Sequence, residues 1–367
     1  DWSSDVCSSD LFKYKEEFLM KKFFTMVAAL AMSGIMLVGC GSSADQGTEG
    51  NTEGTQAEST AAMDTPVDIG IIQLMEHPAL DASREGFISA LAEAGYTDGE
   101  NINIELQNAQ GDQSNLKTIS QKFVSDGKDL ILAIATPSAQ AIATETKDIP
   151  ILITSVTDPA QSGLVDKNEL PNCNVSGTSD LTPVKEQFEL LTKILPDAKK
   201  VTIMYCSGEQ NSVIQADTAE AAAKELGLET ERKTVTSTND VAQVTQSVIG
   251  TCDAVYIPTD NVFASSMPLV SSITNPAGLP VIVGESGMVE GGGLASVAID
   301  YTDLGHITGE MAVEIIEGAD IKTMPIRYAE NPELVVNETA AAELGITIPD
   351  DIKAEATVVN TSNTDAE

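Results

Sequence analysis

Short apolar runs alternate with amphipathic stretches through most of the chain after residue 66. The first run, residues 67–74, is β-branched and short, which is typical of a buried strand. Pro78 then suits the first turn of a helix, and Gly95 suits its left-handed end. The same alternation predicts further strands at residues 101–106, 130–135, 149–156, 174–178, 200–206, 229–235, 252–257 and 279–283, with helices between most of them.

Strands separated by single helices predict right-handed crossovers and parallel sheets. Because the cycle occurs twice, we expect an α/β protein with two doubly wound lobes joined by a multi-strand hinge. Residues 295–352 are too few for a third domain, so we expect them to complete both lobes. The predicted organisation is 67–180 plus 295–320 for lobe 1, 181–294 plus 321–357 for lobe 2, and 358–367 as a flexible tail.

The segment before the lobes has the pattern of an export signal. Lys21 and Lys22 precede an almost uninterrupted apolar run, and Leu37 to Gly39 lead into Cys40. The run is too short to span a bilayer comfortably, and the Leu-Val-Gly-Cys end resembles a bacterial lipobox. We therefore expect residues 20–40 to be a lipoprotein signal peptide, Cys40 to be acylated, and the protein to be anchored to the outer face of the cytoplasmic membrane.

Two further segments are not expected to form part of the folded lobes. Residues 1–19 include a stretch that resembles the translation of a sequencing adaptor, so Met20 is taken as the start. Residues 41–66 are rich in Ser, Thr, Gly, Gln, Glu and Asp and cannot bury enough surface to order, so they predict a disordered linker.

Charge and cysteine content exclude several classes. Acidic residues outnumber basic ones 56 to 20, which argues against a nucleic-acid partner. Cys173, Cys206 and Cys252 show no metal-binding spacing, so no metal and no cofactor are expected. They are interpreted as small, partly buried residues, although a disulfide between two of them would leave the third free.

A ligand site is expected at the carboxyl ends of the parallel strands, where helix N-termini point their free amides. Loops at this edge are 73–77, 136–139 and 155–158 in lobe 1, and 207–212, 259–263 and 284–288 in lobe 2. The candidate ligand-binding residues are Gln73, Glu76, His77, Thr136, Ser138, Ala139, Thr157, Asp158, Ser207, Asn211, Asp260, Asn261 and Glu285.

Thr136 to Ala139 form the best candidate for an anion site. Thr136 is predicted to cap the helix, so that its hydroxyl and the amides of Ser138 and Ala139 converge on a carboxylate. A plain helix cap without a ligand is the alternative.

Asp158 and Asp260 are candidates for an ammonium partner across a closed cleft. Each one could instead only cap the helix or turn that follows it. His77 is interpreted as a positioning or packing residue that could also reach a ligand.

No catalytic constellation is recognisable. The only other histidine after Met20, His306, lies on a predicted surface helix, and residues 284–287 lack the spacing of a nucleophile elbow. Since neither a nucleophile nor a base can be assigned, an enzyme is not expected.

Several motifs resemble one family, the ABC-transporter solute-binding proteins of the tryptophan/tyrosine type, which have the type I periplasmic-binding-protein fold. They are residues 73–81 (QLMEHPALD), 157–159 (TDP), 163–164 (GL), 174–177 (NVSG), 300–301 (DY), 304–305 (LG), 336–337 (VN) and 344–345 (LG). The resemblance implies a monomeric extracytoplasmic protein that closes its lobes on a small ligand and delivers it to an ABC permease.

An aromatic amino acid is the favoured ligand. An aromatic side chain buries about 150–250 Å², more than an aliphatic one, and a sugar needs a denser polar wall. Candidate apolar walls are Met75, Phe263, Met267 and Met288, and any stacking must use Phe or Tyr because the lobes contain no Trp. The alternatives are a signalling receptor, or an uncharged ligand such as a nucleoside or a sugar.

Overall fold

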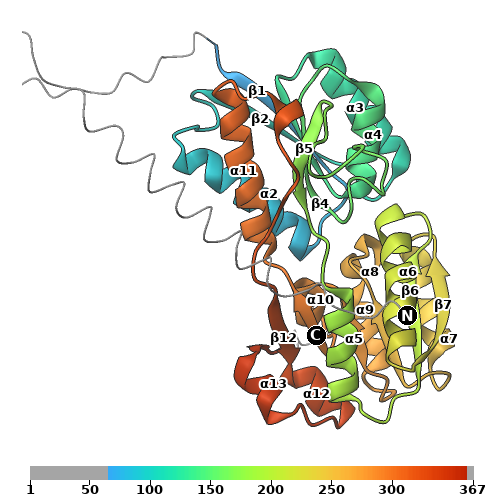
Figure 1. Ribbon diagram of the computed structural model, residues 1–367. Helices are drawn as coiled ribbons and strands as arrows, with labels where there is room; N and C mark the ends of the chain where they lie inside the picture. The colour runs from blue at the N-terminus through green and yellow to red at the C-terminus, as the bar shows by residue number, and fades with distance from the viewer. Residues whose placement is uncertain (1–64, 362–367) are drawn as a thin grey trace, which may run out of the picture. The chain divides into compact units, whose positions relative to one another are not determined.

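The computed structural model describes residues 65–361, which fold around two sheets (Figure 1). The first sheet and the helices beside it are called lobe 1, and the second sheet with its helices is called lobe 2. The predicted signal peptide, Cys40 and residues 41–64 of the predicted linker lie outside the described residues. Within residues 65–361, no helix is both long enough and apolar enough to cross a membrane.

Lobe 1 has a six-stranded parallel sheet in the order β11-β5-β4-β3-β1-β2. Figure 1 shows α2 and α11 on one side of this sheet and α3 and α4 on the other. Its strands are β1 (Val67–Gln73), β2 (Ile102–Asn108), β3 (Leu130–Ile134), β4 (Ile151–Val156), β5 (Val175–Ser179) and β11 (Arg327–Tyr328). Its helices are α2 (Pro78–Glu93), α3 (Gln113–Asp126), α4 (Thr136–Glu145), α11 (Tyr301–Ile316) and the short 3-10 helix η2 (Ile321–Thr323).

Lobe 2 has a seven-stranded sheet in the order β13-β12-β10-β9-β8-β6-β7, parallel except where β12 pairs with β10. Its strands are β6 (Lys200–Cys206), β7 (Glu229–Val235), β8 (Ala254–Ile257), β9 (Val281–Val283), β10 (Ala295–Ala298), β12 (Glu333–Asn337) and β13 (Thr357–Val359). Its helices are α5 (Val184–Ile194), α6 (Gln210–Glu225), α7 (Thr238–Val248), α8 (Asn261–Ser265), α9 (Met267–Thr274), α10 (Ser286–Glu290), α12 (Glu338–Leu344) and α13 (Asp350–Glu355).

The central strands are buried on both faces, as parallel sheets with helices on both sides require. All of the residues of β3, β4 and β8 are buried. In lobe 2 the apolar side chains form two clusters, one beside α5 and α6 and the other beside α7 to α10. The predicted two-lobe α/β fold is therefore confirmed.

Some helix ends are determined by the side chain or the backbone conformation of a single residue. The Asp112 carboxylate accepts hydrogen bonds from the amides of Ser114 and Asn115, so Asp112 caps α3. Gly127 ends α3 and Gly345 ends α12 in the left-handed conformation that glycine favours, with φ of 70° and 68°. Residues 261–274 form two helices, α8 and α9, and Pro268 lies in the first turn of α9.

Three predicted boundaries were wrong. Strand β10 was assigned to lobe 1 but pairs with β9 and β12 in lobe 2, and β11 was assigned to lobe 2 but pairs with β5 in lobe 1. Val358 and Val359 were assigned to a flexible tail but pair with β12. The chain thus crosses between lobes after β5, after β10 and after β11. Hydrophobic periodicity identifies a strand but carries no information about which sheet it joins.

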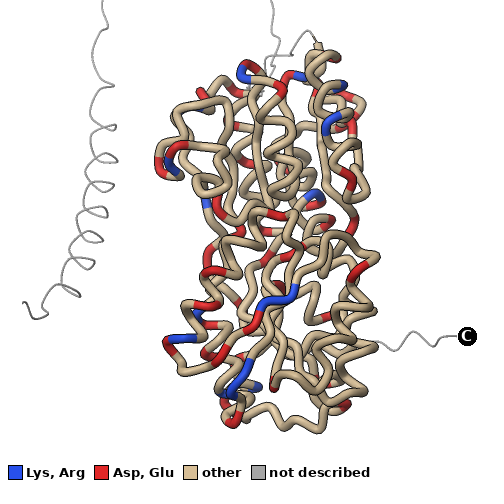
Figure 2. The backbone as a smooth tube through the Cα atoms, turned by 90° about the vertical axis from the view of Figure 1, so that its right-hand side faces the viewer, with Lys and Arg blue, Asp and Glu red and all other residues tan. Residues whose placement is uncertain are grey.

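The acidic excess is spread over both lobes (Figure 2). Lys and Arg occur at few, scattered positions along the backbone. Most of the ion pairs within residues 65–361 join partly exposed side chains. Exposed pairs of this kind contribute little to stability. The distribution agrees with the interpretation of the acidity as a solvated surface.

Helices α2 and α11 pack in parallel at very short distance because glycines form their contact. A Cβ added at Gly305 would lie 1.9 Å from the Ser83 carbonyl oxygen, and one at Gly86 would lie 2.1 Å from that of Thr302. At Gly309 it would lie 2.6 Å from Ala90 Cβ. Since the two helices run in the same direction, this contact brings the N-termini of α2 and α11 to the same end of lobe 1.

We expect Gly305→Ala to lower the Tm of the protein. Alanine favours an isolated helix by up to about 1 kcal/mol over glycine, so any loss comes from the contact with α2, where overpacking costs about 1–3 kcal/mol or more. The measurement is thermal unfolding followed by circular dichroism.

Gly208→Ala is the matched control, because its Cβ would meet only Cys206 Sγ at 3.8 Å, an ordinary contact. Equal Tm values for the two variants would contradict the role of the glycine contact.

Candidate functional site

A small cavity of about 10 Å³ is lined by residues from both lobes. All of them lie at or next to the carboxyl ends of strands or at chain crossings. This interlobe cavity is lined by His77, Leu80, Ser155, Asp180 and Tyr301 from lobe 1, and by Asn211, Thr259, Asp260, Asn261, Ala264 and Glu285 from lobe 2.

The local fold explains why these side chains converge. His77 and Glu285 are the extended residues before α2 and α10, so each follows a strand and turns into a helix. Asp180 follows β5 directly, at one chain crossing. Tyr301 is the first residue of α11, just after another crossing, and its position beside α2 is set by the glycine contact.

Polar side chains join the two lobes beside this cavity. His77 Nε2 lies 3.1 Å from Asn261 Oδ1. Gln215 Nε2 donates to Thr157 Oγ1 at 3.1 Å and also to Thr259 Oγ1. The hydrogen bonds that join the lobes here are therefore made by buried side chains.

Two of the buried carboxylates are already saturated with donors from lobe 2. Asp260 accepts from the amides of Cys206 and Phe263 and from Ser212 Oγ, at 2.5, 2.9 and 2.7 Å. Glu209 accepts from Asn211 Nδ2 and from the amide and side chain of Asn261. Burial raises the pKa of both carboxyls, and repulsion from Asp260 raises that of Glu209 further.

Two other carboxylates are not saturated. Asp180 Oδ2 accepts a hydrogen bond from the Tyr301 hydroxyl at 2.9 Å, but Asp180 Oδ1 has no partner. Glu285 Oε1 also has none, and its closest basic group is His77 Nδ1 at 4.0 Å. Burial raises the pKa of Glu285 to about 8 and that of Asp180 to about 6, the latter against the lowering effect of the nearby hydroxyls of Tyr301 and Thr157.

His77 is neutral in this setting. Burial lowers its pKa to about 4. Asn261 Nδ2 donates to Glu209, so Asn261 Oδ1 faces His77 Nε2 and accepts a hydrogen bond from the Nε2–H group. His77 Nδ1 is then a hydrogen-bond acceptor, and it has no partner.

The structure separates the predicted site residues into two groups. His77, Asn211, Asp260, Asn261 and Glu285 line the interlobe cavity. Thr157 lies beside it, in the hydrogen bonds between the lobes. The other predicted residues, Gln73, Glu76, Thr136, Ser138, Ala139, Asp158 and Ser207, do not line it.

Four residues of the second group have an evident local role or are exposed. The Gln73 side chain donates to Met75 O and Asp81 and accepts from Arg84, so its polar atoms are occupied within lobe 1. Glu76 and Ser207 are exposed. The Asp158 carboxylate accepts from the amides of Ala160 and Gln161, which is the predicted capping role and leaves it away from the cavity.

The predicted cap of α4 was wrong. Ala135, not Thr136, occupies the N-cap position, and the Ala139 amide donates to the Ala135 carbonyl. The hydroxyls of Thr136 and Ser138 are nevertheless buried without a partner.

The predicted apolar walls are also corrected. Phe263, Met267 and Met288 are fully buried in the core of lobe 2. Met75 is partly buried and packs against the cores of both lobes. The apolar side chains that line the cavity are Leu80, Ala264 and the ring of Tyr301.

Sequence reasoning missed Asp180, Glu209, Gln215 and Tyr301 as site residues. Asp180 directly follows a predicted strand, so the rule used for the other loops could have found it. Tyr301 belongs to the Asp-Tyr motif that carried the family resemblance. Gln215 lies one turn inside α6, where no terminal signal marks it.

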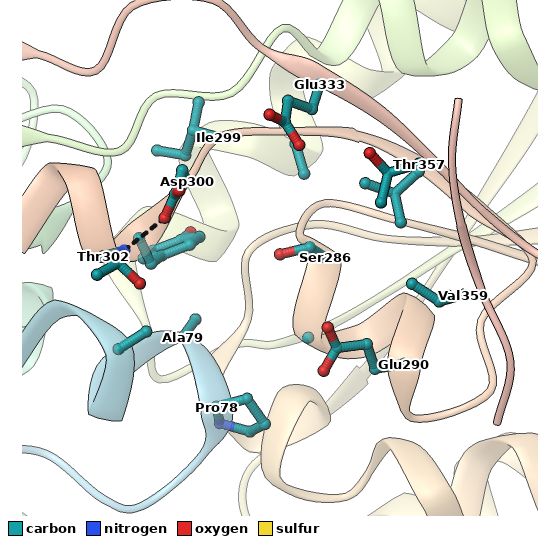
Figure 3. A pocket seen from close by; sticks show the side chains of 15 residues that line it. Pro78, Ala79, Ser286, Glu290, Ile299, Asp300, Thr302, Glu333, Thr357 and Val359 are labelled. Carbon is teal, nitrogen blue, oxygen red and sulfur yellow. Dashed lines mark hydrogen bonds between the residues drawn. The ribbon is translucent and has the colours of Figure 1, made fainter. Parts of the chain in front are cut away.

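A larger cavity, of about 310 Å³, lies beside the N-termini of α2, α10 and α11 (Figure 3). Its acidic residues Glu290, Asp300 and Glu333 are exposed, and Asp300 already accepts from the Thr302 amide at 2.8 Å. No lining residue of this cavity carries a buried polar atom without a partner, whereas four lining residues of the interlobe cavity do. The unmet hydrogen bonds therefore favour the interlobe cavity as the ligand site, despite its smaller volume.

The raised pKa of Glu285 predicts that stability falls as the pH rises. The folded protein keeps a proton up to about pH 8 that the unfolded chain loses near pH 4.5, so this contribution is lost between those values. His77 acts in the opposite sense, but only below its unfolded pKa of 6.5. We therefore expect a higher Tm at pH 6.5 than at pH 8.5 for the protein without added ligand.

Glu285→Gln should reduce this pH dependence, because it removes a titrating group, whereas Glu186→Gln, at an exposed position on α5, should keep it. Differential scanning calorimetry at several pH values provides the test. An unchanged dependence in Glu285→Gln would contradict the assignment.

Comparison with known proteins agrees with this geometry. Residues 68–360 match the family described as ABC transporter substrate binding protein. The chain is 43% identical over 318 residues to the tyrosine-binding protein of Clostridioides difficile (strain R20291), covering 87% of this chain and 90% of that protein.

Two solved structures are similar over their whole length. One is the ABC domain from Streptococcus pneumonia in complex with L-Trp, with 39% identity and a TM-score of 0.78 over 80% of this chain. The other is the ligand-free, open structure of a substrate binding protein with adhesive properties from Clostridium difficile, with 47% identity and a TM-score of 0.63 over 81% of this chain.

More distant structures share the fold alone, including a galactofuranose binding protein with 16% identity and a TM-score of 0.53. The predictions of a type I binding-protein fold and of a binding protein rather than an enzyme are confirmed. This chain belongs to the ABC transporter substrate-binding protein family.

Proposed function

We propose that this protein binds an aromatic amino acid, L-tyrosine or L-tryptophan, and delivers it to the permease of an ABC importer. The observation that carries the proposal is the interlobe cavity, where buried carboxylates lie without a lysine or arginine among the lining residues. Such a site favours a cationic group from outside the chain. The relatives named for tyrosine and crystallised with L-Trp support an aromatic amino acid over other amines.

The carboxylate of the ligand is assigned to the N-terminus of α4. Thr136 and Ser138 offer two buried hydroxyls without partners there, and a helix N-terminus favours an anion by up to about 2 kcal/mol in a partly buried site. Helix α4 follows β3, which is the neighbour of β4 in the sheet, so it begins at the edge from which Ser155 reaches the cavity. This position lets a carboxylate be held without a basic side chain.

Entry of the ligand requires the lobes to separate. A space of about 10 Å³ holds about one water molecule, far less than an aromatic side chain needs. The connections between the lobes beside the cavity are a few hydrogen bonds, which can exchange with water as they open. The better overlay on the L-Trp complex than on the ligand-free, open relative supports a closing motion.

The Tyr301 ring is the aromatic surface available to the ligand. It is buried, held in orientation by its hydroxyl bond to Asp180, and lines the cavity beside Leu80. An aromatic pair adds about 0.5–1.5 kcal/mol beyond the burial of area.

We expect the purified chain to bind L-tyrosine or L-tryptophan and to gain thermal stability from it. A ligand at 100 times its Kd adds about 2.7 kcal/mol to the free energy of unfolding, which raises the Tm measurably. The experiment is a thermal-shift screen over the amino acids followed by calorimetric titration.

Myo-inositol, uridine and the amide of the bound amino acid are the controls. Binding of an uncharged control, without binding of any amino acid, would contradict the proposed function.

We also propose that the protein carries an export signal and a lipid anchor. The lipobox-like sequence ending at Cys40 supports acylation there, and the linker at 41–66 would let the lobes stand away from the membrane.

Cys40→Ala is expected to release the protein into the medium or leave it unprocessed, because the acyl chain is attached through sulfur. Cys252→Ala, in lobe 2, should leave membrane attachment unchanged. Fractionation and electrophoretic mobility measure both. A Cys40→Ala protein that stays in the membrane fraction at normal mobility would contradict the anchor.

A further inference from the structure

Four buried polar atoms without partners point to one group of the ligand. Asp180 Oδ1, Glu285 Oε1, Asn211 Oδ1 and His77 Nδ1 all belong to residues that line the interlobe cavity. The four side chains are at most 6% exposed. Buried polar atoms rarely stay without hydrogen bonds, so a group that supplies them is required.

All four atoms are acceptors. The two carboxylate oxygens are acceptors when ionised, and Asn211 Nδ2 donates to Glu209 and to the Thr259 carbonyl, which leaves Asn211 Oδ1 toward the cavity. His77 Nδ1 is an acceptor because Nε2 carries the proton. With both carboxyls ionised, a carboxylate or a carbonyl of a ligand would find no donor among these four atoms.

An ammonium group matches this set. It offers three N–H donors and a positive charge, and it is about the size of the water molecule that a cavity of about 10 Å³ can hold. No other cation competes for the place, since no lysine or arginine is among the lining residues of the cavity.

We propose that Asp180, Glu285 and Asn211 form the site for the α-ammonium group of the ligand, and that they, rather than Asp158 or Asp260, select amino acids over acids that lack the amine. This inference rests on the proposed function and names the residues of that same site. Asp158 and Asp260 are excluded because backbone amides already occupy their carboxylates.

The two carboxylates come from different lobes. Asp180 follows β5 of lobe 1, and Glu285 follows β9 of lobe 2. Their repulsion is one reason for the raised pKa of Glu285. An ammonium between them favours the ionised form of Glu285, so binding releases the Glu285 proton and the charge of the ligand attracts a carboxylate from each lobe.

The test compares two ligands that differ only in the amine, L-tyrosine and 3-(4-hydroxyphenyl)propanoate. Calorimetric titration is carried out with the parent chain, Asp180→Asn, Glu285→Gln and the double variant. The parent should bind L-tyrosine at least about 30-fold more tightly than the acid, and each single variant should lose at least about 30-fold in affinity for L-tyrosine, as for a broken buried charge pair.

The ratio of the two affinities is the decisive readout. Affinity for the acid should stay the same or rise in the variants, because they remove negative charge, so the preference for L-tyrosine should collapse. Loss of affinity for both ligands in equal proportion would indicate a merely structural role and overturn the proposal. Both substitutions are nearly isosteric, and a Tm equal to or above that of the parent shows that the variants fold.

Glu186→Gln is the matched control, an exposed carboxylate on α5 of the same lobe, and it should keep the parent ratio. Parent-like binding of L-tyrosine by the double variant would mean that the cavity holds only a water molecule, and would overturn the assignment while leaving the proposed function intact. If the parent binds no amino acid, the proposed function itself fails.

Discussion

Carboxylates buried between the lobes without a neighbouring cation impose the main constraint on this structure. Asp180, Glu209, Asp260 and Glu285 are each at most 4% exposed. An unpaired buried charge costs several kcal/mol, so each group must be hydrogen-bonded, protonated or paired with a charge from outside. Lobe 2 meets this need for Glu209 and Asp260 from its own amides and side chains. Asp180 Oδ1 and Glu285 Oε1 are left without a partner.

The number of hydrogen bonds that each buried carboxylate receives distinguishes the acidic residues that support the fold from those that can bind a ligand. The chain has 56 Asp and Glu residues. Most acidic residues are solvated and need no partner, and the capping ones have found backbone donors. Only carboxylates that are both buried and incompletely bonded store free energy that a ligand can release. The same criterion favours the small interlobe cavity over the larger one in Figure 3, where the acids face water.

The order of strands and helices could be predicted from the sequence because each element is determined locally. Runs such as 130–135 are wholly apolar, and Asp112 and Gly127 mark helix ends through their own hydrogen bonds and backbone angles. The sheet to which β10 and β11 belong depends on pairing with strands far along the chain, which no local pattern encodes.

The site residues, like the strands and helices, were predictable only where a local rule applies. The rule that ligands bind at the carboxyl ends of parallel strands found His77, Asn211 and Glu285. It could not show that backbone amides saturate Asp260, or that Tyr301 fixes Asp180, because those are properties of the packed structure.

The glycine contact between α2 and α11 has a consequence for how the chain folds. It joins segments more than 200 residues apart, and all of lobe 2 except β12, α12, α13 and β13 lies between them in sequence. Contacts of such high sequence separation form slowly, since a long loop must close first. The α2 face of lobe 1 therefore stays uncovered until most of lobe 2 has been synthesised, so the last steps of folding in lobe 1 follow, rather than precede, the appearance of its neighbour.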